Sequence, residues 1–125
     1  MTKILLVEDD PYLRRACETS LRRQGYAVVS AIDGEQGLAL ARTEAPDLVL
    51  LDMLMPKLTG LDVLRALRAA PETSALPVLV LSNSSRQADV DEVQQLGVAG
   101  YLVKANLSLE QLGEEVRRLC RETTR

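Results

Sequence analysis

The sequence of 125 residues contains no histidine. This absence excludes serine or cysteine nucleophiles activated by a histidine base, metal sites built from histidine, and a phosphorylated histidine on this chain. Cysteine is scarce, because only Cys17 and Cys120 are present, each among apolar residues of a predicted helix. We interpret both as reduced thiols that pack as small hydrophobic side chains, since a metal site would need more ligands.

An excess of basic residues and a long apolar run are also lacking. The chain has 15 Lys and Arg against 18 Asp and Glu, for a net charge of −3. Domains that bind nucleic acid normally present a basic face, so no direct nucleic-acid binding is expected. No apolar run is long enough to cross a bilayer, and acidic residues follow the first apolar run too closely for a signal peptide. A cytoplasmic protein without membrane contact is expected.

The sequence instead has short apolar runs that alternate with amphipathic segments, without a linker. Strands are predicted at 3–8, 26–32, 48–52, 77–83 and 100–104, and helices at 11–24, 33–44, 60–69, before Gly97 and at 108–120. In the last helix, Leu109, Leu112, Val116 and Leu119 are predicted to face inward. Continuous apolar strands that alternate with helices predict one α/β domain over residues 1–125, a parallel sheet with helices on both faces.

Charged and polar residues stand where the predicted strands end. Glu8 and Asp9 follow the first strand, Asp52 ends the third, Ser82 lies at the end of the fourth, and Lys104 ends the fifth. In such sheets ligands bind beyond the carboxyl ends of the strands. If the first strand lies between the second and the third, the three carboxylates converge. They then repel one another unless a cation is bound, and hard oxygen ligands suit Mg²⁺.

Each of these residues also has a purely structural interpretation. An acidic residue can cap a helix, which suits Asp10 before Pro11, while Ser82 can be a turn hydroxyl and Lys104 an exposed lysine at a strand end. Taken together, these residues favour a reactive site over purely structural roles. A carboxylate beside Mg²⁺ that faces a lysine and a hydroxyl can attack phosphorus and become an acyl phosphate. The acidic first loop argues against a flavin or nucleotide phosphate, which needs free backbone N–H groups there.

These residues resemble the receiver domains of two-component response regulators, over essentially the whole chain. The resemblance rests on "ILLVEDDP" (Ile4–Pro11), "DLVLLDMLMPKLTGLDVL" (Asp47–Leu64), "PVLVLSN" (Pro77–Asn83) and "GYLVK" (Gly100–Lys104). The pattern D-x-x-M-P-x-x-x-G, from Asp52 to Gly60, is highly specific for that family. The fold expected from it is a single doubly wound, flavodoxin-like domain with five parallel strands in the order 2-1-3-4-5.

The resemblance implies a Mg²⁺ site around a phosphorylated aspartate. Asp52 would accept the phosphoryl group and also ligate the metal. Asp9 would be a second metal ligand, and Glu8 would hold the waters of the metal ion. The backbone carbonyl of Leu54 would be a further ligand.

The resemblance also implies a switch. Lys104 would bind the phosphoryl group, and the hydroxyl of Ser82 would move to a phosphoryl oxygen. Tyr101 would turn inward with it and couple the site to the face made by the fourth helix, the fifth strand and the fifth helix. Apart from the resemblance, Tyr101 is simply a half-buried strand residue.

Two positions depart from the pattern of the family. Asn83 stands where the family usually has a small residue, next to the phosphoryl pocket. Ala105 stands where the family usually has a proline, often after a cis bond. A cis bond before a residue other than proline costs ~3 kcal/mol, so a trans bond between Lys104 and Ala105 and an altered loop toward Asn106 are predicted.

The function expected is a phosphorylation-dependent signalling switch rather than an enzyme. A partner histidine kinase or phosphotransfer protein would be the donor, because this chain has no histidine. A downstream effector domain or protein would read the output face. Homodimerisation through that face stays open, although Gly100 replaces an acid that DNA-binding relatives often use in dimer salt bridges.

Two other functions are weighed against the switch. A phosphate-independent protein-binding module of the same fold would lack Asp52, Asp9 or Lys104, and all three are present. An aspartyl-phosphate hydrolase usually carries a second aspartate two residues after the nucleophile, where this chain has Leu54. The sequence leaves open whether the chain is a stand-alone receiver or part of a longer protein.

Overall fold

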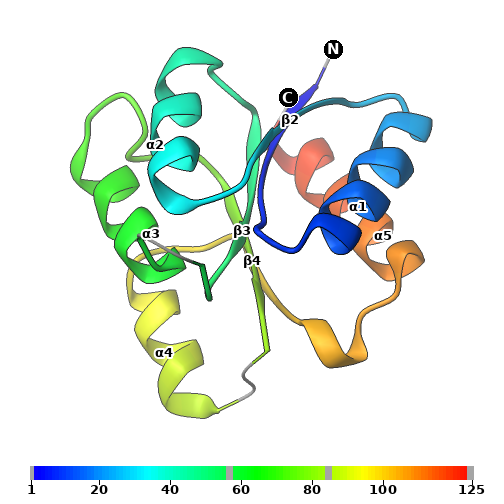
Figure 1. Ribbon diagram of the computed structural model, residues 1–125. Coiled ribbons are helices and arrows are strands. Elements are labelled where there is room, and N and C mark those ends of the chain that lie inside the picture. The colour runs from blue at the N-terminus through cyan, green and yellow to red at the C-terminus, as the bar shows by residue number, and fades with distance from the viewer. Residues whose placement is uncertain (1, 56–57, 84–85, 124–125) are drawn as a thin grey trace.

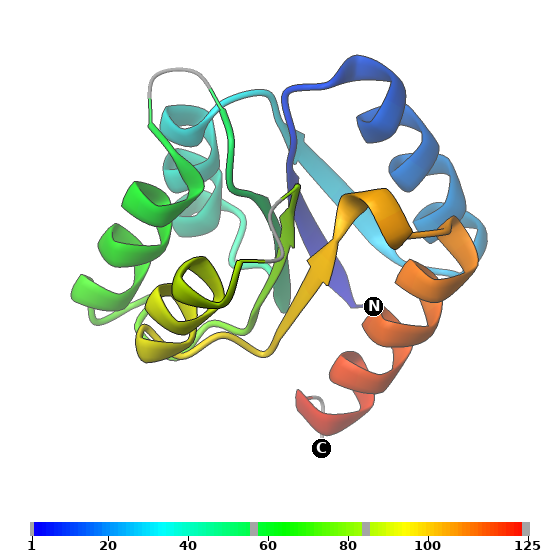
Figure 2. The same ribbon diagram turned by 90° about the horizontal axis from the view of Figure 1, so that it is seen from below.

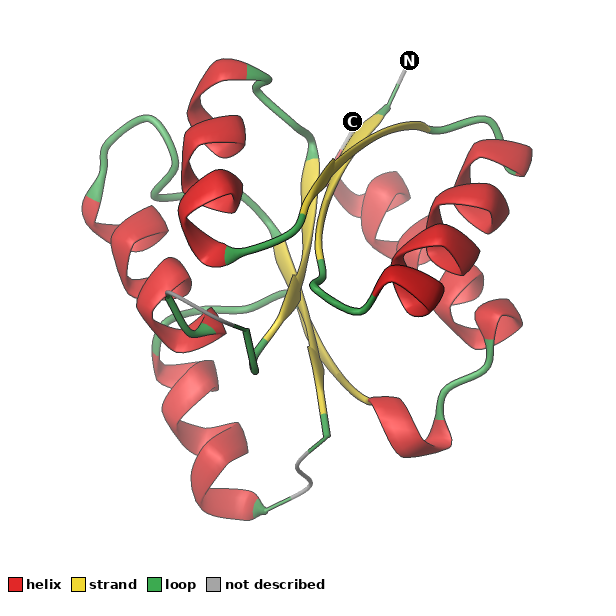
Figure 3. Ribbon diagram, viewed as in Figure 1, coloured by secondary structure: helices red, strands yellow, loops and turns green. Residues whose placement is uncertain are grey.

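Five parallel strands form the single sheet of the computed structural model, which describes residues 2–55, 58–83 and 86–123. The strands are β1 (Lys3–Val7), β2 (Ala27–Ala31), β3 (Leu48–Asp52), β4 (Val78–Ser82) and β5 (Gly100–Val103). Their order is β2-β1-β3-β4-β5, as predicted, and Figure 3 shows the sheet enclosed by the helices. Each expected element is present, with ends that differ by a few residues from the prediction.

The helices cover the sheet in two layers. They are α1 (Pro11–Arg23), α2 (Gly34–Thr43), α3 (Gly60–Ala69), α4 (Gln87–Gln95) and α5 (Leu109–Thr123). Helices α1 and α5 lie on one face, and α2, α3 and α4 lie on the other (Figures 1 and 2). Right-handed crossovers between parallel strands account for helices on both faces of this strand order.

Two hydrophobic cores result from the alternation of side chains along the strands. In β3, Leu48 and Leu50 pack toward the layer of α1 and α5, whereas Val49 and Leu51 pack toward the layer of α2, α3 and α4. Because both faces are covered, β3 and β4 are buried at every residue. A continuous apolar run is the sequence pattern that such a strand requires.

The strand register brings the carboxyl ends of the strands to one edge. Val7 of β1 pairs with Leu51 of β3, and Ser82 of β4 pairs with Val103 of β5. The residues that follow these strands therefore arrive at the same edge of the sheet. This edge is where the sequence predicted a site.

Side-chain caps fix where the helices begin beyond that edge. Asp10 accepts hydrogen bonds from the N–H groups of Tyr12 (2.9 Å) and Leu13 (3.4 Å), which confirms its predicted role as a helix cap. Asp33 likewise accepts one from Gln36 N–H (2.8 Å) at the start of α2. These bonds satisfy N–H groups that have no partner inside a helix.

The prediction for one residue of α5 is wrong. Leu109 was expected to face inward, but it is 40% exposed. It is the first residue of the helix and lines a surface groove with residues of α1, whereas Leu112, Val116 and Leu119 are buried as expected. The stripe of buried apolar side chains on α5 therefore begins one helical turn later than the apolar spacing suggested.

Two further expectations agree with the structure. Cys17 and Cys120 are both buried and reduced, as predicted. The bond between Lys104 and Ala105 is trans, and the chain continues into a short 3₁₀ turn, Lys104–Asn106. Across the described parts of the chain, none of the helices is long and apolar enough to span a bilayer.

Candidate functional site

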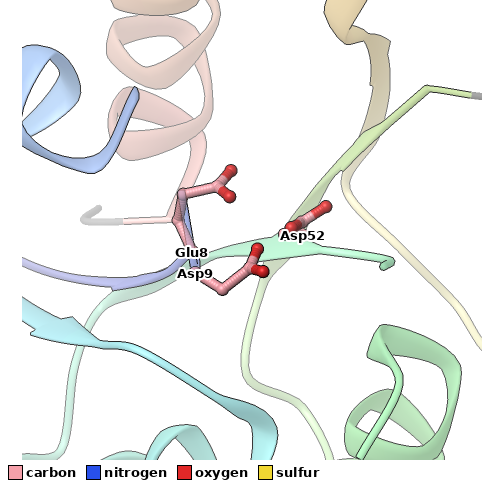
Figure 4. Close-up of side chains that lie close together, drawn as sticks. All are labelled: Glu8, Asp9 and Asp52. Atoms are coloured by element: carbon pink, nitrogen blue, oxygen red, sulfur yellow. The ribbon is translucent and has the colours of Figure 1, made fainter. Parts of the chain in front are cut away.

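Three carboxylates converge at the carboxyl edge of the sheet. Glu8 and Asp9 follow β1, and Asp52 ends β3, the neighbouring strand. One oxygen atom from each lies within 4.8 Å of one from each of the others. Figure 4 shows the side chains of Glu8 and Asp9 projecting toward Asp52. We call these three residues the carboxylate cluster.

Glu8 is the most deeply buried acid of the cluster, with no exposed surface. Its Oε2 accepts a hydrogen bond from Asp10 N–H (3.1 Å), and its Oε1 contacts the Lys104 ammonium. Burial raises the pKa of Glu8 from 4.5 to about 7, against the opposing effect of the hydrogen bond from Lys104. The nearby charge of Asp52 raises this pKa further. A cation beside the cluster is therefore favoured electrostatically.

Lys104 is not an exposed lysine at a strand end. Its Nζ lies 2.9 Å from Glu8 Oε1 and 3.0 Å from Asp52 Oδ1, and its side chain is 16% exposed. Burial alone would lower the pKa of Lys104, but the hydrogen bonds to these two carboxylates outweigh it, so the pKa is raised. The ammonium group therefore stays charged and bridges β1, β3 and β5.

Asp52 is held at the tip of a fully buried strand. It is 2% exposed, and its Oδ1 accepts a hydrogen bond from Leu54 N–H (3.3 Å) in addition to its contact with Lys104. Behind it, α3 begins so close that a Cβ at Gly60 would lie 2.4 Å from the carbonyl oxygen of Asp52. Glycine is needed for that approach. Pro56, in the same sequence pattern, lies outside the described residues.

Ser82 and Tyr101 line a cavity of about 630 Å³ beside the cluster. Ser82 is buried at the end of β4, and Tyr101 is half-buried on β5 and packs against the core beneath α3 and α4. Asn83 and residues of α4 also line this cavity. The two predicted switch residues thus share one space between the cluster and α4.

Arg14 contributes to the site although the sequence analysis did not identify it. From α1 its Nη1 donates hydrogen bonds to the carbonyl oxygens of Glu8 (3.1 Å) and Asp9 (3.4 Å). The only signal in the sequence is its position four residues after Asp10, at the start of the helix. That spacing indicates one helical turn but says nothing about the loop that the side chain reaches.

The cluster suits a small divalent cation. Two oxygens bound to one Mg²⁺ at about 2.1 Å lie at most about 4.2 Å apart, so oxygens within 4.8 Å of one another need only small side-chain rotations to bind it. The donors are hard carboxylate oxygens, which Mg²⁺ prefers. Glu8 Oε1 is buried, and its polar contact in the described structure is the Lys104 ammonium at 2.9 Å, so a metal-bound water could serve as a further donor.

Comparisons with known proteins agree on one family. A sequence model of the response regulator receiver domain matches residues 4–117. The transcriptional regulatory protein AfsQ1 of Streptomyces coelicolor is 42% identical over 106 residues, which cover 83% of this chain and 45% of AfsQ1. Protein PilH of Pseudomonas aeruginosa is 38% identical over 104 residues, which cover 83% of this chain and 86% of PilH.

Solved structures give the same result for the fold. The chemotaxis response regulator CheY4 of Vibrio cholerae superposes with a TM-score of 0.88 at 30% identity, over 95% of this chain and 98% of CheY4. The chain spans about half the length of AfsQ1 and of several other curated relatives that it matches.

Proposed function

This chain belongs to the receiver domains of two-component response regulators, a family of signalling switches, and we propose that it is switched by phosphorylation of Asp52. The observation that carries the proposal is the Lys104 ammonium, 3.0 Å from Asp52 Oδ1 at the edge where three carboxylates converge. A buried carboxylate at a strand tip, beside a fixed cation, is poised to accept an anionic group.

The proposed reaction is a phosphoryl transfer to a carboxylate. An oxygen of Asp52 attacks the phosphorus of the donor, the bond from phosphorus to the leaving atom of the donor breaks, and the electron pair stays with that leaving atom. Lys104, freed from Asp52 Oδ1, pairs with a phosphoryl oxygen. The chain itself contributes position and charge, which are the main contributions that proteins make to phosphoryl transfer.

Mg²⁺ is the proposed cofactor of this reaction. Asp9, Asp52 and the carbonyl oxygen of Leu54 would ligate it, and Glu8 would hold its waters. When bound, the ion offsets negative charge on the phosphoryl oxygens and on the carboxylates. The hard oxygen donors of the cluster and their spacing support this assignment.

Ser82 and Tyr101 are the proposed switch residues. In the phosphorylated state the hydroxyl of Ser82 bonds a phosphoryl oxygen, and Tyr101 moves into the space that Ser82 leaves. Their shared cavity supports this coupling. Phosphorylation then shifts the population of two packings of α4, β5 and α5, because it makes contacts in only one of them.

The proposed partners follow from the family and from the composition. A histidine kinase or a phosphotransfer protein supplies the phosphoryl group, since this chain has no histidine. An effector domain or protein reads the face of α4, β5 and α5. The transcriptional regulators among the relatives support an effector that controls transcription. Homodimerisation through the same face is one form that the output can take.

Intact mass spectrometry after incubation with a small acyl phosphate tests the proposal. We expect one phosphoryl adduct that requires Mg²⁺ and disappears in Asp52→Asn. Asp91→Asn is the matched control, because Asp91 is an exposed carboxylate on α4 and the same substitution there leaves the adduct in place.

A folded wild-type protein that forms no adduct with any donor would contradict the proposal. That result would favour the alternative function, a receiver-like module that works by protein contacts alone. An adduct that persists in Asp52→Asn would instead show that another residue accepts the phosphoryl group.

A further inference from the structure

We propose that Arg14 is a positioning residue for the metal site, and that its hydrogen bonds to the loop after β1 hold two acids of the carboxylate cluster in place. The inference rests on the proposed function, since it concerns the same Mg²⁺ site. Arg14 does not belong to the cluster, and among the described residues it makes no ion pair with a carboxylate. Its guanidinium contacts main-chain carbonyl groups of the residues that carry two of the carboxylates.

The loop after β1 needs such support because it turns out of the sheet. Consecutive residues of a strand point to opposite faces, so Glu8 and Asp9 can both project toward Asp52 only if the strand stops before them. Glu8 N–H makes the last ladder bond, to Ala31 O (3.0 Å). Beyond it, in the described structure, the donor to the carbonyl oxygens of Glu8 and Asp9 is Arg14 Nη1, at 3.1 and 3.4 Å.

Helix stability does not explain where this side chain lies. The first turn of a helix carries partial positive charge, so a cation folded back over it is unfavourable. Arg14 is in the second turn of α1, yet its side chain points back past Asp10 to the preceding loop. The electrostatic gain therefore comes from the carbonyl groups and from the acids around them. Arg14 is half-buried, whereas its neighbour Arg15 is exposed.

Positioning and charge make opposite predictions for metal binding. On charge alone, removing a cation a few ångströms from the cluster would strengthen the binding of Mg²⁺. If Arg14 holds the loop, its removal lets the two carboxylates move relative to Asp52 and weakens the binding. Substitution of residues that orient metal ligands typically lowers metal affinity 10- to 100-fold. The sign of the change therefore distinguishes the two roles.

The test is a Mg²⁺ titration of the unphosphorylated protein, followed by amide chemical shifts, which also report that each variant is folded. We expect Arg14→Gln to raise the Mg²⁺ dissociation constant about tenfold. Arg14→Lys keeps the charge without the planar fork and should fall between Arg14→Gln and the wild type. Arg15→Gln is the matched control, because it removes the same charge from an exposed neighbour, and it should change the constant less than about twofold.

Phosphorylation by a small acyl phosphate gives a second measurement. In Arg14→Gln the Mg²⁺ concentration for half-maximal rate should rise by the same factor, while the rate at saturating Mg²⁺ stays near that of the wild type. Equal or tighter Mg²⁺ binding by folded Arg14→Gln would overturn the inference and leave the proposed function intact. If the wild type itself bound no Mg²⁺, this result would contradict both the proposed metal site and the proposed role of Arg14.

Discussion

At the scale of single residues, Glu8 gives the metal-free protein a specific pH dependence. Burial raises its pKa to about 7, while the same carboxyl ionises near 4.5 in the unfolded chain. The folded state therefore binds this proton more tightly. The stability that Glu8 contributes is fully present below about pH 4.5 and is lost as the pH rises to about 7, after which it stays constant. The loss is on the order of 3 kcal/mol.

Urea unfolding in the presence of a chelator, at pH 5 and at pH 8, measures this effect. Between these pH values the free energy of unfolding of Glu8→Gln should fall less than that of the wild type, because glutamine does not ionise. Glu114→Gln, at an exposed position of α5, should follow the wild type. Identical pH dependence in Glu8→Gln and the wild type would contradict a raised pKa for Glu8.

The residues of the site differ in how far the sequence could predict them. Glu8, Asp9 and Asp52 could be predicted because they follow continuous apolar runs, and parallel strands bring their carboxyl ends to one edge. The ion pairs of Lys104 with both β1 and β3 could not be derived from spacing, since they depend on strand order. Arg14 was missed because a long flexible side chain reaches backbone carbonyl groups, which leave no trace in the side-chain pattern.

At the scale of elements, α4 is the helix that its own side chains stabilise least. Val93 is its one buried residue among those described, and no side chain caps its first turn. Two arginines of α3 attach it instead. Arg68 donates to the carbonyl oxygens of Leu96 (2.9 Å) and Gly97 (2.6 Å), at the end of α4. Its charge also suits the negative end of the helix dipole.

The removal of Arg68 should therefore loosen α4 more than the removal of its neighbour on α3. We expect Arg68→Ala to lower the free energy of unfolding by ~1–2 kcal/mol and to speed amide exchange in α4. Arg65→Ala is the matched control, because it breaks only an exposed ion pair with Glu92 (3.1 Å), worth under about 1 kcal/mol. Equal losses from the two substitutions would show that the carbonyl contacts of Arg68 contribute nothing specific.

The sequence predicted best the elements that have a strong apolar pattern, and α4 lacks one. The apolar runs of β3 and β4 and the apolar stripe of α3 identified these elements without ambiguity. In α4 the pattern is mostly polar, and only its end could be placed, before Gly97. In α5, Leu109 continues the helical spacing but lies at the first residue, beyond the buried stripe. Periodicity shows which face of a helix is apolar, but not where along the helix the core ends.

At the scale of the whole molecule, the carboxylate cluster sets a balance between stability and metal binding. The two cores give the domain its stability, and the cluster at the shared edge of the sheet reduces it, because three carboxylates are held together with one lysine. If the cluster holds Mg²⁺ as proposed, the ion binds the folded chain and not the unfolded one, so it should raise the melting temperature. At tenfold over the dissociation constant the gain is about 1.4 kcal/mol. For a domain of this size that corresponds to about 5 °C.

Asp9→Asn should reverse sign between the two conditions, which makes it the sharpest test of this balance. In a chelator it should melt above the wild type, because one of the mutually repelling charges is gone. In Mg²⁺ it should melt below the wild type, because a metal ligand has been lost. Asp91→Asn should respond to Mg²⁺ as the wild type does. Thermal unfolding of the three proteins in both buffers measures this, and Asp9→Asn melting above the wild type in Mg²⁺ as well would show that Asp9 does not hold the metal.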